Sequence, residues 1–413
     1  MNAEWEDKLQ EDFMQNKKWL PDLWLSDVSN STRVEKTAGG IVSSSSSPTW
    51  HLAISIGLSP VPLITMAASS TSELLLTDIA TQDITCIPSN YIRPISDRPN
   101  LLDVEFSNAQ IPLVDLQDLL GPDRSRVVEA IGLACQNGGF FQVKNHGIPE
   151  AMIDDVLRVS KEFFQLPVSE RLKNYSDDPM KTTRLSTSFN VRTEKVRSWR
   201  DYLRLHCYPL EHFVHEWPSN PGTFRQIVSD YCKKVRDVAL QILEAMSESL
   251  GLEQNYISKA LGSHAQHMAI NYYPPCPQPE LTYGLPAHKD PNVITLLLQD
   301  DVPGLQVLKD ANWVAVDSSR YNLVINVGDQ IQALSNGKYK SVLHRAVVND
   351  SSPRISIPTF YCPSPDAVIR PAESLVGEEH PPLYRSFTYA EYYDKFWSQG
   401  LNSASCLDVF RAR

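Results

Sequence analysis

The sequence predicts an α+β fold in which a β-barrel of the jelly-roll or cupin type is flanked by helices and preceded by a helical N-terminal region. Apolar residues recur at helical spacing before residue 262, whereas short apolar runs separated by turn residues follow from Met268 onward. Closely spaced short strands of this kind are typical of a barrel. Two histidines, an aspartate, an arginine and a serine fall on or beside these strands, which predicts a ligand cavity inside the barrel.

The helical region is predicted from apolar spacing and from residues that start and stop helices. Gly138 and Gly139 end the first helix, Pro149 opens the next one, and Pro167 follows its end. The expected elements are a strand over 111–115, a helix over 124–135, a strand over 140–145 and a helix over 149–166.

A long helix is expected from Thr223 to Gly251, with Gln226 completing a capping-box pattern at its start. Its apolar residues recur every three or four positions, so they form one buried stripe. A helix of this length needs a sheet or barrel to pack against. The predicted core-facing residues are Ile227, Tyr231, Val235, Val238, Ile242 and Met246.

The barrel strands are predicted from short apolar runs bounded by Gly, Pro, Asn and Asp. His264 and His267 are expected to precede the first of them and not to bind a metal. The expected strands cover 293–299, 304–308, 313–316, 323–327, 341–348 and 355–361.

A metal site is predicted from His288, Asp290 and His344. Side chains two apart in a strand share a face, so His288 and Asp290 can act together. A lone His-x-Asp pair is weak evidence, because a core histidine with one hydrogen bond explains it. A second histidine on a distant strand completes the two-histidine, one-carboxylate set that binds Fe(II) and leaves other coordination positions open.

A carboxylate site is predicted beside the metal. Arg354 and Ser356 share a strand face, so a guanidinium fork and a hydroxyl can hold one carboxylate together. Asn271 and Tyr273 are also two apart, within a proline-rich stretch that is otherwise explained as a rigid connector. The pattern therefore predicts an anionic co-substrate next to the iron.

Composition limits the classes of partner and the cellular location. The net charge of -11 argues against nucleic acid as a partner, because phosphate binding needs a basic face. Seven scattered cysteines without a CxxC pair favour reduced thiols and a cytoplasmic protein, with the nucleus as an alternative. No apolar run reaches the length of about 18 residues that spans a bilayer, so no membrane is expected. We expect a monomer.

The N-terminal 65 residues differ from the rest, with five consecutive serines at 43–47 and an acidic start. Such sequence buries too little apolar surface to fold, so we interpret it as a disordered extension. Met66 offers a second translation start, which makes the extension an isoform or gene-model addition. The predicted regions are 1–65 as this extension, 66–110 as an N-terminal segment, 111–262 as a mainly helical region, 263–365 as the barrel and 366–413 as a helical C-terminal segment.

The motifs resemble those of the plant soluble Fe(II)/2-oxoglutarate-dependent dioxygenases over residues 111–396. They are Gly139-Phe-Phe-Gln-Val-Lys-Asn-His-Gly-Ile-Pro149, Asn271-Tyr-Tyr-Pro-Pro-Cys-Pro-Gln-Pro-Glu280, His288-x-Asp290, Pro303-Gly-Leu-Gln-Val307, His344-Arg345 and Arg354-x-Ser356. The stretches 182–190, 199–206 and 262–268 resemble the downy-mildew-resistance-like oxygenases, a subgroup similar to salicylic acid hydroxylases.

The resemblance implies a double-stranded β-helix and roles for individual residues. His288, Asp290 and His344 would bind Fe(II), and Arg354 and Ser356 would hold the C5 carboxylate of 2-oxoglutarate with Tyr273 and Asn271. It further implies O2 as the oxidant, ascorbate as the reductant, and hydroxylation of a substrate coupled to decarboxylation of 2-oxoglutarate to succinate and CO2.

The substrate implied by the subgroup is a small aromatic acid, most of all salicylic acid, hydroxylated at C3 or C5. An apolar slot could come from Phe360, Phe189 and Leu205, with Cys362 at its border. A donor to the substrate carboxylate could come from Arg184, Arg204 or His206.

Two alternatives stay open. One is oxidation of flavanones by an enzyme of the flavone synthase type, which Ala269 weakens, because flavonoid-acting relatives often carry a lysine at that position. The other, from a different class, is a metal-binding receptor that holds a ligand without turnover. A complete iron triad beside Arg354 and Ser356 speaks against the receptor, because a receptor needs no open iron position.

Overall fold

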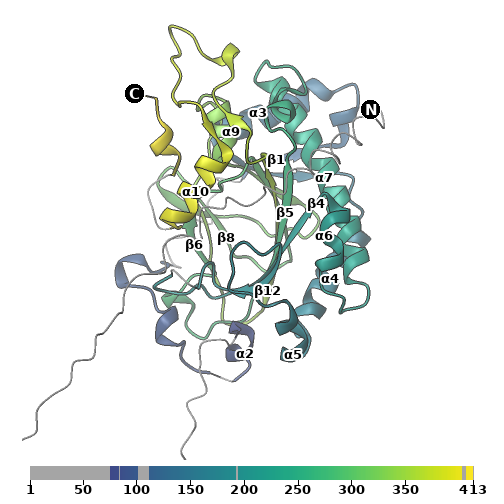
Figure 1. Ribbon diagram of the computed structural model, residues 1–413, viewed down its shortest axis with the longest axis vertical. Coiled ribbons are helices and arrows are strands. Elements are labelled where there is room, and N and C mark those ends of the chain that lie inside the picture. The colour runs from purple at the N-terminus through teal and green to yellow at the C-terminus, as the bar shows by residue number, and fades with distance from the viewer. Residues whose placement is uncertain (1–74, 83, 101–110, 192–193, 402–405, 413) are drawn as a thin grey trace, which may run out of the picture. The chain divides into compact units, whose positions relative to one another are not determined.

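The computed structural model describes residues 75–82, 84–100, 111–191, 194–401 and 406–412. The predicted extension over 1–65 lies outside these residues, as do 66–74, 83 and 101–110 of the predicted segment 66–110. In the described part, two β-sheets form the core, and helices cover the outer face of the larger sheet (Figure 1).

The larger sheet has eight strands in the order β1-β2-β10-β7-β12-β5-β4-β3. All of its pairs are antiparallel except β1 with β2. The smaller sheet has four antiparallel strands in the order β6-β11-β8-β9, and β13 pairs with β14. The strands are β1 Leu113–Asp115, β2 Phe140–Lys144, β3 Thr183–Thr187, β4 Asp201–Tyr208, β5 Ala265–Tyr273, β6 Leu285–His288, β7 Ile294–Gln299, β8 Leu305–Lys309, β9 Asn312–Ala315, β10 Leu323–Val327, β11 His344–Ala346, β12 Arg354–Cys362, β13 Val368–Ile369 and β14 Phe387–Thr388.

The longer helices lie mainly between the first strands and at the C-terminal end. α3 ends before β2, where Gly139 has a φ of +62°, outside the helical region. A Cβ at this position would lie 1.9 Å from the carbonyl oxygen of Lys340, so only glycine fits there. The α-helices are α2 Leu76–Ala80, α3 Arg124–Asn137, α4 Glu150–Gln165, α5 Val168–Arg171, α6 Leu210–Phe213, α7 Phe224–Ser249, α8 Tyr256–Ala260, α9 Asp329–Leu334 and α10 Tyr389–Gln399. Short 3₁₀ turns make up most of the remaining helical residues.

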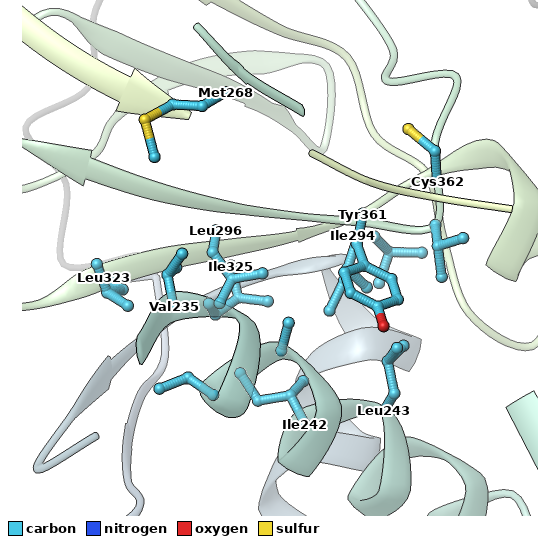
Figure 2. Packing of buried hydrophobic residues seen from close by; sticks show 14 of the residues in the cluster. Val235, Ile242, Leu243, Met268, Ile294, Leu296, Leu323, Ile325, Tyr361 and Cys362 are labelled. Carbon is cyan, nitrogen blue, oxygen red and sulfur yellow. The ribbon is translucent and has the colours of Figure 1, made fainter. Parts of the chain in front are cut away.

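Alternation along the strands of the larger sheet separates two environments. On the outer face, Ile294 and Leu296 of β7 and Ile325 of β10 pack against α7. Figure 2 shows this contact with Val235, Ile242 and Leu243 of the helix. The inner face meets the smaller sheet through a second apolar cluster, made of Ile111, Phe140, Leu297, Leu305, Val307, Val316 and Val324.

The predicted fold class, a barrel of two sheets with flanking helices, is confirmed, and most predicted elements are found within a few residues of their expected limits. The prediction of a capping box is wrong. Thr223 precedes the first residue of α7 but makes no side-chain capping hydrogen bond, and Gln226 donates to Asp230 instead. Ile227 is only partly buried, because Val228 lies on the buried face.

Several elements were missed or misplaced in the prediction. β3 and β4 were not predicted, because polar and charged residues interrupt their short apolar runs. β5 begins at Ala265, so His267 lies inside the strand that it was expected to precede. The strand expected over 341–348 is reduced to β11, and α9 was not predicted.

None of the described helices is long and apolar enough to cross a membrane. All seven cysteines carry free thiols.

Replacing Leu296 by Ala should lower the free energy of unfolding by about 2–5 kcal/mol, because this side chain is 0% exposed between β7 and α7. Leu120→Ala is the control, because Leu120 is 79% exposed, and it should change that free energy by less than about 0.5 kcal/mol. Urea unfolding followed by circular dichroism measures both. Equal losses in the two variants would contradict the packing described for α7.

Candidate functional site

The candidate metal site lies where β6 and β11 pair. His344 and His288 are direct partners across these strands, and Asp290 lies two residues beyond the end of β6. The Nε2 atoms of both histidines are 3.7 Å from Oδ1 of Asp290, and the two imidazole centroids are 4.2 Å apart. One ligand atom from each side chain lies within 4.8 Å of the other two, which is close enough for one ion to bind all three. The strand-face argument holds for His288, whereas Asp290 lies in the loop that follows β6.

Hydrogen bonds orient all three side chains. Nδ1 of His288 lies 2.8 Å from the carbonyl oxygen of Pro286, and Nδ1 of His344 lies 3.2 Å from that of Val342. A carbonyl only accepts, so each Nδ1 carries the proton and each Nε2 keeps its lone pair for a metal. Oδ2 of Asp290 accepts from Oγ1 of Thr295 at 2.5 Å and from Nδ2 of Asn326 at 2.7 Å, which leaves Oδ1 for the ion.

The charge state of the triad also suits a divalent cation. Burial, followed by the neighbouring His344, lowers the pKa of His288 to about 3, so the imidazole is neutral near pH 7. Burial acts to raise the pKa of Asp290, but His344, His288 and the two hydrogen bonds outweigh it and lower that pKa. Two neutral imidazoles and one carboxylate are the donor set that binds Fe(II) while leaving positions open. The residues therefore fit the iron predicted from the sequence.

A buried cation lies further along the inner face. Arg354 is 2% exposed and donates from Nε to the carbonyl of Val302 at 3.1 Å and from Nη2 to Oε1 of Gln299 at 2.7 Å. Its Nη1 is buried and has no hydrogen-bond partner. A buried donor of a charged group without a partner is costly, so the geometry suits an anion that supplies the missing acceptor.

Polar groups surround this guanidinium at one level of the sheet. Arg354 pairs with Tyr273, and Ser356 pairs with Asn271, across β12 and β5. Nδ2 of Asn271 donates to Oγ of Ser356 at 3.2 Å, and that Oγ lies 3.5 Å from the hydroxyl of Tyr273. The four residues predicted from the sequence are thus brought together, and they can hold one carboxylate of 2-oxoglutarate. We refer to this group as the carboxylate pocket.

Gly304 makes room for the guanidinium of the carboxylate pocket. A Cβ at this position would lie 2.8 Å from Nε of Arg354, closer than side chains pack. A glycine is therefore needed behind the arginine, at the start of β8.

Both groups open into one cavity of about 190 Å³ between the two sheets. Its larger wall is built from inner-face rows of the eight-stranded sheet, in which Tyr202 pairs with Asn271, Arg204 with Ala269, and Phe360 with His267. The C-terminal helix α10 adds aromatic side chains to the lining. Its lining includes Phe189, Arg200, Arg204, Phe360, Tyr393 and Trp397.

Only some of the residues predicted to bind the substrate line the cavity. Phe360, Phe189, Arg204 and Cys362 line the cavity. Leu205 does not, because it follows Arg204 on β4 and its side chain lies in the outer core.

Arg184 and His206 also do not line the cavity. Arg184 lies on the edge strand β3, where it donates to the carbonyl of Ser176 and to Oγ of Ser186. His206 pairs with His267, and their rings stack at 4.1 Å, so His267 stands between it and the cavity.

The prediction missed Arg200, Tyr202 and the aromatic residues of α10. Arg200 and Tyr202 precede and follow Asp201 in a stretch quoted only as a family motif, and their alternation with Arg204 was the available signal. The sequence does not predict that α10 lies at the cavity, because α10 is far along the chain from the strands that form the rest of the lining.

Comparison with known proteins agrees with this site. Residues 264–363 match the family model of the 2OG-Fe(II) oxygenase superfamily, and residues 111–220 match a model described as the non-haem dioxygenase in morphine synthesis N-terminal domain. Both matches fall inside the regions predicted over 263–365 and 111–262, a division that we retain as a proposal.

Two relatives and one solved structure are similar over most of the chain. Protein DMR6-LIKE OXYGENASE 1 of Arabidopsis thaliana is 59% identical over 84% of this chain and 99% of its own. Flavanone 3-dioxygenase 2 of Oryza sativa subsp. japonica is 55% identical over 84% of this chain and 100% of its own. The crystal structure of JOX2 in complex with 2OG, Fe and JA is 35% identical, with a TM-score of 0.74, over 83% of this chain and 98% of that one.

Replacing His288 by Ala should abolish iron binding and all turnover of 2-oxoglutarate, because two ligands do not hold the ion. Calorimetric titration with Fe(II) under argon and succinate release measure the two effects. His146→Ala is the control, since His146 bonds only to the backbone of Tyr321 and Ile148. Retained succinate production in an iron-free His288 variant would refute the assignment.

Replacing Asn326 by Ala should weaken iron binding about 10–100-fold without abolishing it, because Asn326 orients Asp290 and does not itself provide a ligand. The same titration measures the dissociation constant. An unchanged constant would show that Thr295 alone orients the carboxylate.

Proposed function

Because this chain belongs to the 2OG-Fe(II) oxygenase superfamily, we propose that it hydroxylates a small aromatic acid, with salicylic acid as the substrate. In the balanced reaction, 2-oxoglutarate and O2 are consumed, succinate and CO2 are released, and one oxygen atom becomes the new hydroxyl group of the ring. The position of that group, C3 or C5, is a result of the experiment below.

The enzyme class and its cofactors follow from the family. The chain is a 2-oxoglutarate-dependent dioxygenase, and the predicted receptor without turnover is set aside. The resemblance to downy-mildew-resistance-like oxygenases is confirmed by the most similar of the relatives above.

The arrangement of side chains suggests how the reaction is organised. His288, Asp290 and His344 would hold the iron, and the carboxylate pocket would fix 2-oxoglutarate by its far carboxylate. When bound, the iron supplies the oxidising chemistry that links decarboxylation of 2-oxoglutarate to hydroxylation of the substrate. The protein contributes position and exclusion of water, because aromatic side chains close the remaining wall.

The observation that carries the substrate proposal is a cation facing an aromatic wall. Arg204 lines the cavity, and its Nε is buried without a hydrogen-bond partner, while Nη2 donates to the carbonyls of Pro179 and Lys181. Its partner across the strands is Ala269, whose short side chain leaves the space above the guanidinium open. A ring with a carboxylate can pack against Phe360 and bond to Arg204.

The histidines beside Arg204 do not compete for this role. Burial, followed by Arg204, lowers the pKa of His267 to about 3. Burial, His267 and Arg204 also lower the pKa of His206. Both rings are neutral near pH 7, so among the predicted donors Arg204 is the cation that can hold a substrate carboxylate.

A second candidate is oxidation of a flavanone, which the 55% identity to Flavanone 3-dioxygenase 2 favours. A flavanone is a neutral molecule of three rings. It would leave Arg204 without an anionic partner, and it needs more room than one substituted ring beside 2-oxoglutarate. We therefore rank it second.

Product analysis separates the two candidates. The protein is incubated with Fe(II), 2-oxoglutarate and ascorbate, and with either salicylate or naringenin, and the products are identified by mass spectrometry. We expect a dihydroxybenzoate from salicylate. Oxidised naringenin together with unchanged salicylate would establish the second candidate instead.

Replacing Arg204 by Gln should raise the KM for salicylate about 10–100-fold, because a hydrogen bond to a charged group contributes about 1.5–3 kcal/mol. The KM for 2-oxoglutarate should change less than threefold, since Arg204 lies outside the carboxylate pocket. Initial rates of succinate formation measure both constants. An unchanged KM for salicylate would assign its carboxylate to another donor.

A further inference from the structure

We propose that Arg200 is a positioning residue that couples the carboxylate pocket to the aromatic side chains closing the cavity. These side chains are Phe189 and Trp397, whose rings stack with centroids 4.9 Å apart and planes 9° apart; we call them the aromatic clasp. The inference deepens the proposed function by naming how binding of 2-oxoglutarate prepares the substrate site.

Arg200 makes hydrogen bonds in two directions. It is 6% exposed and lines the cavity immediately before β4. Nη1 donates to Oδ1 of Asn271 at 2.8 Å, and Nε donates to the carbonyl of Ser188 at 2.9 Å. Both acceptors are neutral, so the hydrogen bonds orient these groups and leave the positive charge of Arg200 uncompensated by them.

Toward the carboxylate pocket, Arg200 determines which way the amide of Asn271 faces. An arginine only donates, so it must meet the amide oxygen, and the NH2 group is then directed at Ser356. Nδ2 of Asn271 donates to Oγ of Ser356 at 3.2 Å. Because that oxygen accepts from Asn271, its own proton, which points to the Tyr273 hydroxyl at 3.5 Å, can turn to a carboxylate. Arg200 thereby makes Ser356 a donor to 2-oxoglutarate without touching it.

Toward the aromatic clasp, Arg200 holds the backbone before Phe189. Ser188 has a φ of +60°, an unfavourable conformation for a residue with a side chain, and its N–H donates to the carbonyl of Arg200 at 2.9 Å. The carboxylate of Glu194 accepts from Oγ of Ser188, from N of Phe189 and from N of Asn190. The hydroxyl of Tyr202 donates to the carbonyl of Phe189 at 3.0 Å. Several hydrogen bonds therefore hold this loop, and those of Arg200 connect it to the carboxylate pocket.

The chain of contacts from Ser356 through Asn271, Arg200 and Ser188 to Phe189 predicts a measurable coupling. A carboxylate that accepts from Ser356 strengthens the orientation of Asn271, which favours the bonded position of Arg200. That position holds the loop of Phe189 against Trp397. Hydrogen exchange at the loop measures this coupling directly.

The test compares amide hydrogen exchange in the full-length Fe(II)-loaded protein under argon, with and without saturating 2-oxoglutarate and with no substrate present. We expect 2-oxoglutarate to slow exchange of the amides of 188–190 about fivefold or more, the lower end of typical coupling between sites. In Arg200→Lys this effect should fall below twofold, because one ammonium group does not reproduce the two directed bonds of the guanidinium.

Arg184→Lys is the matched control. Arg184 is a buried arginine on the neighbouring strand β3, and it bonds to Ser176 and Ser186, not to Asn271 or Ser188. This variant should keep the full response to 2-oxoglutarate. The inference is overturned if the unmodified protein shows no response, if Arg200→Lys retains it, or if Arg184→Lys loses it equally.

A second variant tests the same link if Arg200→Lys does not fold. Coupling is reciprocal, so loosening the aromatic clasp with Phe189→Leu should raise the dissociation constant of 2-oxoglutarate about threefold or more in calorimetry. An unchanged constant would overturn the inference. Neither measurement contains salicylate, so failure of the proposed substrate would leave both results interpretable.

Discussion

The pairing of β12 with both β5 and β7 is the constraint on which the site depends. Its nine residues alternate between an outer face, where Ile355 and Ile357 pack in the core shared with α7, and an inner face that carries Arg354, Ser356 and Phe360. A shift of one residue in this register would exchange the two faces and bury the carboxylate pocket in the apolar core. Packing of α7 on the outer face therefore also positions the groups that bind ligands on the inner face.

The inner face carries charged groups at an energetic cost when no ligand is bound. Nη1 of Arg354 and Nε of Arg204 are buried without partners, and Asp290 is a buried carboxylate between two imidazoles. Each arrangement is unfavourable in an isolated chain, and each becomes favourable when an anion or a cation binds. Iron and 2-oxoglutarate should accordingly stabilise the folded protein as well as take part in its chemistry.

Much of the site could be predicted because alternation is a local property. Arg354, Ser356, Asn271 and Tyr273 were placed from a two-residue period, and the structure brings these residues to the cavity. The same period should have excluded Leu205, which is adjacent to Arg204, and included Tyr202. Those two errors came from treating residues 199–206 as a family motif without assigning them to a strand.

The sequence by itself determined the fold class, the iron triad and the carboxylate pocket, because residue type and strand period carry that information within a few positions. Which residues line the substrate side of the cavity could be identified only from the tertiary structure. Arg204 is singled out among the predicted donors because pairing of β4 with β5 sets it opposite Ala269. The aromatic clasp joins Phe189 to Trp397, some two hundred residues later. Contacts between residues so far apart depend on how sheets and helices pack, and no local pattern in the chain encodes them.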